Sequence, residues 1–303
     1  MSVDRLVLVT KKTALEELLE RHYSRGQAQF FLASRGSAIE PYIRTHEVYH
    51  KALDKLVTTL PRDIPHVSVE RDELYNFLFR PTDLVVAIGP DGLFVNLAKY
   101  LHGQPVIGVN PDPATIKGVT MRHKPCQVPA AIVAVASGQA ELDSVTLAEL
   151  MTNDGRRLTA VNDFLIGRCD QVSARYRLGY GPCQEHQSSS GILVSTGLGQ
   201  SGWLSSIINM VTSFGGQPGA LGTLAWGDPA LTFVVREPFV SSDTQAELVH
   251  GLIQAKLLLT VESEMPEGGY IISDGMVDDG LQFNAGTTIT IKPALEQAKL
   301  VKP

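Results

Sequence analysis

The chain has 303 residues, of which 44% are hydrophobic and 19% are charged, so it can bury a core and is too apolar for disorder. A formal net charge of -6 argues against a basic nucleic-acid-binding surface, and no apolar run is long enough to cross a bilayer. The odd set of cysteines, Cys126, Cys169 and Cys183, is typical of a reducing compartment. No targeting signal precedes the strand-like segment Arg5–Thr10, so we expect a soluble cytoplasmic protein.

Residues 1–125 alternate strand and helix patterns. Apolar runs predict strands at Arg5–Thr10, His66–Val69, Leu84–Ile88 and Val106–Val109. Helical spacing predicts helices at Leu15–His22, Gln27–Ala33, Ile39–Leu60 and Leu93–Leu101. Strand, turn, helix and strand in succession form a βαβ unit, so this region is predicted to be an α/β domain with a parallel sheet.

Residues 126–291 have a sequence pattern typical of packed antiparallel sheets. Short β-branched runs predict strands at Ala130–Ala136, Leu158–Ile166, Ser173–Leu178, Ile192–Ser195, Leu231–Val235, Leu257–Val261, Tyr270–Ile272 and Thr287–Ile291. Asp154-Gly155, Asp274-Gly275 and Asp279-Gly280 are predicted hairpin turns, and Trp203–Phe214 is the predicted helix. The segment 292–303, with helix-like residues Ala294–Leu300, is expected to return to the first domain. The predicted class is therefore α+β: an α/β domain followed by a β-sandwich.

Asp91 is the first candidate functional residue. It lies in the turn Gly89–Gly92, where a buried strand gives way to a helix, and parallel sheets place ligands at this end of their strands. Backbone N–H groups there can face a phosphate, and a carboxylate can hold Mg²⁺ or accept a hydroxyl proton. Asp-Gly is also an ordinary turn pair, and spacing alone favours that interpretation.

Two further segments carry polar or glycine-rich patterns. The segment 197–202 matches G-x-G-x-x-G but lacks the acidic residue that a dinucleotide fingerprint needs about 20 positions later. It is equally compatible with a plain turn and a binding loop, with Ser201 as helix N-cap. Asn162-Asp163 interrupts an apolar stretch, for which an Asx turn or bulge is the simpler explanation. Cys183 and His186 have metal-ligand spacing without a second pair nearby, so no metal-ligand set is predicted.

Taken together, these motifs resemble the NAD kinase family, and most closely its mitochondrial-type branch. The resemblance rests on patterns in chain order that extend over nearly the full chain: Thr10–Thr13, the helix Ile39–Leu60, Val85–Gly92, Pro105–Pro113, Val161–Gly167, Ser189–Gly191, Ser195–Trp203, Arg236–Pro238 and Ser273–Gly275. The combination is specific, although no single motif is.

The resemblance implies phosphorylation of the adenosine-ribose 2′-hydroxyl of NAD by ATP with Mg²⁺. It implies a cleft between the α/β domain and the β-sandwich, usually in a homodimer, with small-molecule nucleotides rather than nucleic acid or membranes as partners. By this resemblance Asp91 is the catalytic carboxylate, and Gly89 and Gly92 bind phosphate. The implied substrate-binding residues are Asn162, Asp163, Thr196, Gly199, Ser201 and Trp203.

The sequence departs from the family pattern at several positions. Pro90 stands where the family has glycine, and proline removes an N–H donor and fixes φ near about -65°. If the family's glycine at this position has positive φ, the turn must be rebuilt to accept Pro90. If the position is N1 of a helix, proline is tolerated there. Asp163 replaces glutamate, and Leu198 and Gln200 replace polar or small residues. Two alternatives therefore stay open: a catalytically impaired NAD(P)-binding regulatory protein, or a kinase of a sugar or lipid hydroxyl.

Overall fold

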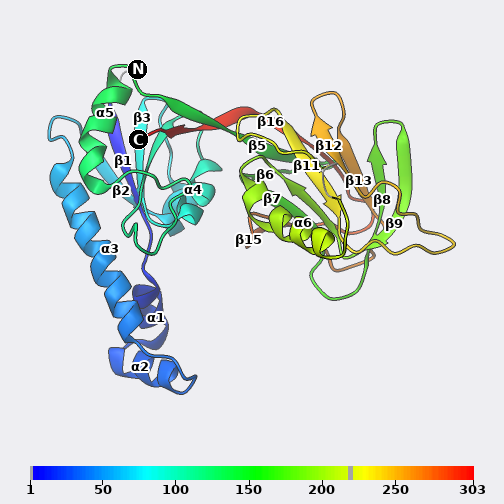
Figure 1. Ribbon diagram of the computed structural model, residues 1–303, viewed down its shortest axis with the longest axis horizontal. Helices are drawn as coiled ribbons and strands as arrows, with labels where there is room; N and C mark the ends of the chain where they lie inside the picture. Colours follow the sequence, from blue (N-terminus) through cyan, green and yellow to red (C-terminus); the bar gives the residue numbers. More distant parts are fainter. Residues whose placement is uncertain (1–2, 218–220) are drawn as a thin grey trace. The chain divides into compact units, whose positions relative to one another are not determined.

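The computed structural model describes residues 3–217 and 221–303, whose contacts divide the chain into two units. The first unit contains the chain up to Asp143 together with Lys299–Pro303, and the second contains Ser144–Ala298. Figure 1 shows helices around a parallel sheet in the first unit and antiparallel sheets in the second. The predicted α+β class is therefore confirmed.

The sheet of the first unit is parallel and runs in the order β2-β1-β3-β4-β16. Its strands are β1 (Arg5–Thr10), β2 (His66–Glu70), β3 (Asp83–Ile88), β4 (Pro105–Val109) and the end of β16 (Thr288–Val301). Every residue of β3 is buried, as expected for a central strand covered on both faces. The buried carboxylate at its start, Asp83, forms an ion pair with Arg5 at 2.6 Å.

Helices cover both faces of this sheet (Figure 1). The helices of the first unit are α1 (Ala14–His22), α2 (Arg25–Ala33), α3 (Glu40–Thr59), α4 (Asp91–Ala98) and α5 (Val128–Ala136), with 3₁₀ turns at Arg71–Asn76 and Pro125–Gln127. α3 and α5 pack on one face, where Leu56 and Ile132 join the core of the sheet, and α4 lies on the other. None of the described helices has the length and apolar character needed to cross a membrane.

Two predicted elements at the borders of the first unit are wrong. Residues 130–136 form part of helix α5 rather than a strand, because Val128, Ala131, Ile132 and Val135 repeat at helical spacing and all four are buried. α5 packs on the parallel sheet, so the first unit extends to Asp143 rather than ending at residue 125. The segment Ala294–Leu300 belongs to strand β16 rather than a helix, and it does return to the first unit by pairing with β4.

The second unit is built from antiparallel pairs. One set runs β16-β13-β8-β9, with β5 and β6 attached, and the other runs β12-β11-β10-β7-β14-β15. The strands are β5 (Leu142–Thr152), β6 (Arg157–Ala160), β7 (Asp163–Arg168), β8 (Ala174–Tyr180), β9 (Cys183–Ser189), β10 (Ile192–Ser195), β11 (Ala230–Val235), β12 (His250–Gln254), β13 (Leu259–Ser263), β14 (Gly269–Ser273) and β15 (Met276–Gln282). Buried apolar side chains of both sets, including Phe164, Phe233 and Tyr176, share one core. Helix α6 (Trp203–Ser213) follows the 3₁₀ turn Gly199–Ser201 and packs on β10 and β11.

The turns of the second unit follow the sequence in part. The hairpins predicted at Asp154-Gly155 and Asp274-Gly275 are confirmed, and Asp274 and Gly275 have φ of 52° and 72°. The turn predicted at Asp279-Gly280 is wrong, since both residues lie within β15. The predicted strand 158–166 is divided at Val161-Asn162 into β6 and β7. Part of the glycine-rich loop predicted at 215–222 lies outside the described residues.

Candidate functional site

The turn after β3 accommodates proline without distortion. Pro90 is the N-cap of α4 with φ of -74° and ψ of 165°, which is an extended conformation that proline adopts readily. Gly89 donates its N–H to the carbonyl of Val109 at 3.2 Å and does not have positive φ. A Cβ at Gly92 would meet no described atom within 4 Å. Replacement of the family's glycine by Pro90 therefore requires no rebuilt turn, and Gly92 leaves open space beside the start of α4.

Asp91 holds the loop that follows β4. Its Oδ1 accepts hydrogen bonds from the N–H of Thr120 at 2.7 Å, the Thr120 hydroxyl at 3.0 Å and the N–H of Met121 at 3.1 Å. Partial burial acts to raise the pKa of Asp91, but the backbone donors of Thr120, Met121 and Val119 outweigh it. The pKa of Asp91 is therefore below its ordinary value, and the carboxylate is ionised at neutral pH.

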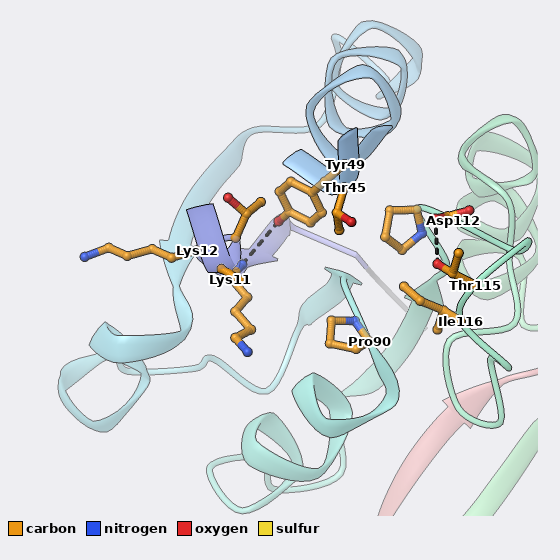
Figure 2. A pocket seen from close by; sticks show the side chains of 11 residues that line it. Lys11, Lys12, Thr45, Tyr49, Pro90, Asp112, Thr115 and Ile116 are labelled. Atoms are coloured by element: carbon orange, nitrogen blue, oxygen red, sulfur yellow. Dashed lines mark hydrogen bonds between the residues drawn. The ribbon is translucent and has the colours of Figure 1, made fainter. Parts of the chain in front are cut away.

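A pocket lies at the carboxyl ends of β1, β3 and β4, within the first unit (Figure 2). Its volume is about 260 Å³, and its lining combines residues after these strands with two side chains of α3: Lys11, Lys12, Thr13, Ala14, Thr45, Tyr49, Pro90, Pro111, Asp112, Thr115 and Ile116. Ligands of doubly wound sheets bind at this end of the strands. The pocket therefore occupies the expected place for a small-molecule site.

Hydrogen bonds fix the walls of this pocket. The hydroxyl of Tyr49 accepts from the N–H of Lys11 at 3.2 Å and donates to the carbonyl of Ile88 at 3.4 Å, which ties α3 to the ends of β1 and β3. On the opposite wall, the carboxylate of Asp112 accepts from the Thr115 hydroxyl at 2.6 Å (Figure 2). These hydrogen bonds hold the lining residues in defined positions in this structure.

The two lysines after β1 have different surroundings. The ammonium of Lys12 is paired with Glu20 at 2.7 Å and with Glu70 at 3.8 Å, which raises the pKa of Lys12. In Figure 2 the side chains of Lys11 and Lys12 extend in different directions from the backbone. The ammonium of Lys12 is therefore engaged in ion pairs. The ammonium of Lys11, which extends in another direction, is the cation that we expect an anionic ligand in the pocket to contact.

In the second unit, a half-buried carboxylate organises the junction between β6 and β7. Oδ1 of Asp274 accepts from the backbone N–H groups of Val161 at 3.1 Å, Asn162 at 2.6 Å and Asp163 at 3.2 Å. Asp163 is 8% exposed, whereas Asn162 is half-buried. Successive N–H groups that converge on one oxygen form an anion nest, which fixes this junction.

The loop after β10 packs directly against this junction. The Thr196 hydroxyl donates to the carbonyl of Val161 at 2.6 Å and accepts from the N–H of Gly199 at 3.1 Å, and the N–H of Thr196 donates to the carbonyl of Asn162 at 2.9 Å. A Cβ at Gly199 would lie 2.1 Å from the carbonyl oxygen of Asn162. Thr196 and Gly199 therefore hold this loop against Val161 and Asn162. Any contact that they make with a ligand would be in addition to this packing role.

Ser201 and Trp203 lie on the exposed side of the same loop. Ser201 donates its hydroxyl to the carbonyl of Leu198 at 3.2 Å, and Gly202 is the N-cap of α6, so the predicted N-cap role of Ser201 is wrong. Trp203 is 37% exposed, and the guanidinium of Arg236 lies 5.1 Å from the centroid of its ring. This exposed ring is available for stacking with a planar ligand.

The predicted residues thus fall into two groups, one in each unit. Gly89, Asp91 and Gly92 surround the start of α4, whereas Asn162, Asp163, Thr196, Gly199, Ser201 and Trp203 surround the junctions of β6, β7 and β10. The sequence analysis gave no individual role to five residues that hold or line these groups: Lys11, Tyr49, Asp112, Thr120 and Asp274. All except Thr120 lie in segments that carry the family resemblance. For Lys11, position directly after a predicted strand was an available signal.

No protein-family model matches the chain. It is 30% identical over 121 residues to human NAD kinase 2, mitochondrial, a match that covers 38% of this chain and 27% of that protein. Its fold is similar to the crystal structure of an NAD kinase from Archaeoglobus fulgidus in complex with ATP, with a TM-score of 0.58 and 16% identity over 98% of this chain and 93% of that one. The chain therefore has the NAD kinase fold over nearly its whole length, and its predicted resemblance to the NAD kinase family is confirmed.

Proposed function

We propose that this protein is an ATP-dependent NAD kinase, which transfers the terminal phosphoryl group of ATP to the 2′-hydroxyl of the adenosine ribose of NAD. The observation that carries the proposal is the position of Asp91, an ionised carboxylate at the end of β3 and the start of α4. Its support is the NAD kinase fold and the similarity to human NAD kinase 2, mitochondrial.

The donor nucleotide occupies the pocket at the ends of β1, β3 and β4. Lys11 supplies positive charge for the phosphates, and the start of α4 at Gly92 faces them, whereas the N–H of Gly89 is bonded to the carbonyl of Val109. The open space beside Gly92 supports this assignment, since a phosphate requires close approach to the backbone.

Mg²⁺ fits the oxygen donors of this pocket. Magnesium prefers one or two carboxylates together with substrate phosphates, and Asp112 brings a carboxylate to the pocket wall. Asp112 would hold the ion that accompanies the nucleotide, and that ion would neutralise phosphate charge during transfer.

Asp91 orients the attacking hydroxyl. A carboxylate with a lowered pKa is a weak base, but phosphoryl transfer depends more on positioning than on a strong base. In the transfer, the bond from the ribose 2′-oxygen to the terminal phosphorus forms as the bond to the bridging oxygen breaks. The hydroxyl proton passes to the Asp91 carboxylate, and ADP leaves with the bridging oxygen.

The acceptor nucleoside binds to the second group of residues. The half-buried amide of Asn162 and the carboxylate of Asp163 can hydrogen-bond ribose or base, Ser201 contributes its exposed hydroxyl, and Trp203 stacks on a ring. Thr196 and Gly199 hold the loop against Asn162, which keeps these groups in place.

The direct test measures NADP formed from NAD and ATP-Mg²⁺, detected by reduction with an NADP-specific dehydrogenase. Product above the level of Asp91→Asn is expected, and light scattering should show a homodimer. If calorimetry shows that NAD binds but no NADP forms, the protein is instead a regulatory NAD(P)-binding protein. Phosphate transfer to a sugar or lipid in preference to NAD would show a kinase of another hydroxyl substrate. The ordinary φ of Pro90 removes a strained turn from the motives for the regulatory alternative.

A further inference from the structure

A cluster of nitrogen and oxygen ligands lies where α1 meets α3, outside the proposed phosphoryl-transfer groups. Glu16 comes from the first turn of α1, and His46 and His50 are four residues apart on α3, which places them on one face of the helix. One ligand atom of each residue lies within 4.8 Å of the others, and all three residues are half-buried. The spacing of 30 residues between Glu16 and His46 hides this cluster from sequence inspection.

Hydrogen bonds to Thr13 assign the tautomer of His46. The Thr13 hydroxyl donates to Oε2 of Glu16 at 3.0 Å, so its oxygen is an acceptor at the 2.9 Å contact with Nδ1 of His46. His46 therefore carries its proton on Nδ1 and has its lone pair on Nε2. A histidine oriented by a hydrogen bond from its other ring nitrogen is the usual arrangement of a metal ligand.

Glu16 and His50 already have ligand-like separation. Oε1 of Glu16 lies 3.0 Å from Nε2 of His50. Two ligands about 2.0–2.1 Å from one tetrahedral zinc ion are separated by about 3.3 Å. A metal ion can therefore replace the proton between these atoms, with neutral His50 moving that proton to Nδ1 through solvent.

We propose that Glu16, His46 and His50 bind a divalent transition-metal ion of the zinc class. Imidazole nitrogens select zinc and related ions over Mg²⁺, which prefers oxygen ligands, so this site is distinct from the magnesium assigned to the nucleotide. Three protein ligands leave a fourth position for water.

The metal links the first turn of α1 to α3. Thr13, the N-cap of α1, lines the pocket and hydrogen-bonds to both Glu16 and His46, while Tyr49 precedes His50 on α3. Bound metal would therefore stabilise the wall formed by these two helices. Because ion binding favours the folded state by mass action, it should raise the melting temperature without any requirement for kinase activity.

The experiment uses the full chain with its affinity tag removed and metal stripped by chelation. Calorimetry with ZnCl₂ at pH 7.5, in parallel with a Co²⁺ absorption spectrum and thermal unfolding, measures binding directly. We expect one ion per chain with micromolar or lower Kd, tetrahedral Co²⁺ absorption and a higher Tm with zinc. His46→Ala and His50→Ala should each weaken binding at least 100-fold, and Glu16→Gln, which keeps an acceptor for the Thr13 N–H, at least 10-fold.

The matched control is His66→Ala, which removes an exposed histidine of β2 in the same unit and should bind zinc as the unmodified chain does. Circular dichroism of each variant checks that it is folded. Zinc binding weaker than millimolar in the unmodified chain, or equal affinity in the His46 and His50 variants, would overturn the proposal. Neither outcome depends on the kinase assay, so failure of this inference is distinguishable from failure of the proposed function.

Discussion

Oδ1 of Asp91 accepts the backbone N–H of Thr120 at 2.7 Å, which ties the start of α4 to the loop after β4. The residue proposed to orient the attacking hydroxyl therefore also supports its surroundings. A single substitution at position 91 can abolish activity through lost chemistry or through a displaced loop. The two effects are separable, because asparagine retains an oxygen at the position of Oδ1 and alanine does not.

Asp91→Asn and Asp91→Ala should both reduce kcat at least 100-fold, since both remove the acceptor of the hydroxyl proton. Only alanine should also lose about 1–3 kcal/mol of unfolding free energy, because the N–H groups of Thr120 and Met121 lose their partner. Urea unfolding and NADP formation measure the two effects. An asparagine variant with a rate near that of the unmodified enzyme would contradict the catalytic role.

The free energy of unfolding at acid pH should depend on protonation of the Asp91 carboxylate. The pKa of Asp91 in the folded protein lies below its ordinary value of 3.8. Its contribution to stability is thus fully present above the unfolded pKa and is lost as the pH falls through the folded pKa. The free-energy difference between the unmodified chain and Asp91→Ala should shrink between about pH 4 and pH 2. Urea titrations of both proteins at pH 7, 4 and 3 test this, and a difference that widens in acid would contradict it.

Pro90→Gly should not improve the enzyme. The φ of Pro90, -74°, is natural for proline, so glycine gains no relief of strain and adds entropy to the unfolded chain. We expect a loss of about 0.4–1 kcal/mol in unfolding free energy. The kcat should stay within twofold of the unmodified value. A tenfold rise in kcat would mean that proline obstructs the phosphate site.

Much of the fold could be predicted from periodicity, and the exceptions have identifiable causes. The strands around β3 and the helix α3 were predicted because strongly apolar runs and long amphipathic spacing are local signals. Helix α5 was missed because its alternating valine and alanine residues also suit a strand. The division at Val161-Asn162 depends on hydrogen bonds to Asp274, a residue more than 100 positions away.

The candidate site was visible in the sequence where a residue follows a predicted strand or lies in a segment that carries the family resemblance. Asp91 was selected as a candidate because a glycine-flanked acid after a buried run is visible in the sequence. Thr120 and Tyr49 reach their partners, Asp91 and Lys11, only through tertiary structure. No local spacing predicts such contacts.

Lys11→Met should weaken ATP binding, and Lys12→Met is its matched control. Loss of a charge-assisted bond to phosphate costs about 1.5–3 kcal/mol, which corresponds to a KM for ATP raised about 10- to 150-fold. Lys12 is engaged with Glu20 and Glu70 near the surface, so its substitution should leave this KM within about threefold. Initial rates at varied ATP-Mg²⁺ measure both. Equal effects of the two substitutions would contradict the assignment of Lys11 to the phosphates.

Asp274→Ala should affect the acceptor substrate selectively. Alanine leaves the N–H groups of Val161, Asn162 and Asp163 without their carboxylate partner, which costs about 1–3 kcal/mol and loosens the junction of β6 and β7. Asp274 acts through this junction as a positioning residue, so the KM for NAD should rise about tenfold or more while the KM for ATP stays unchanged. Asp274→Asn retains one acceptor oxygen and should fall between alanine and the unmodified enzyme. Initial rates with each substrate varied in turn measure this split, and a parallel rise in both KM values would instead indicate general unfolding.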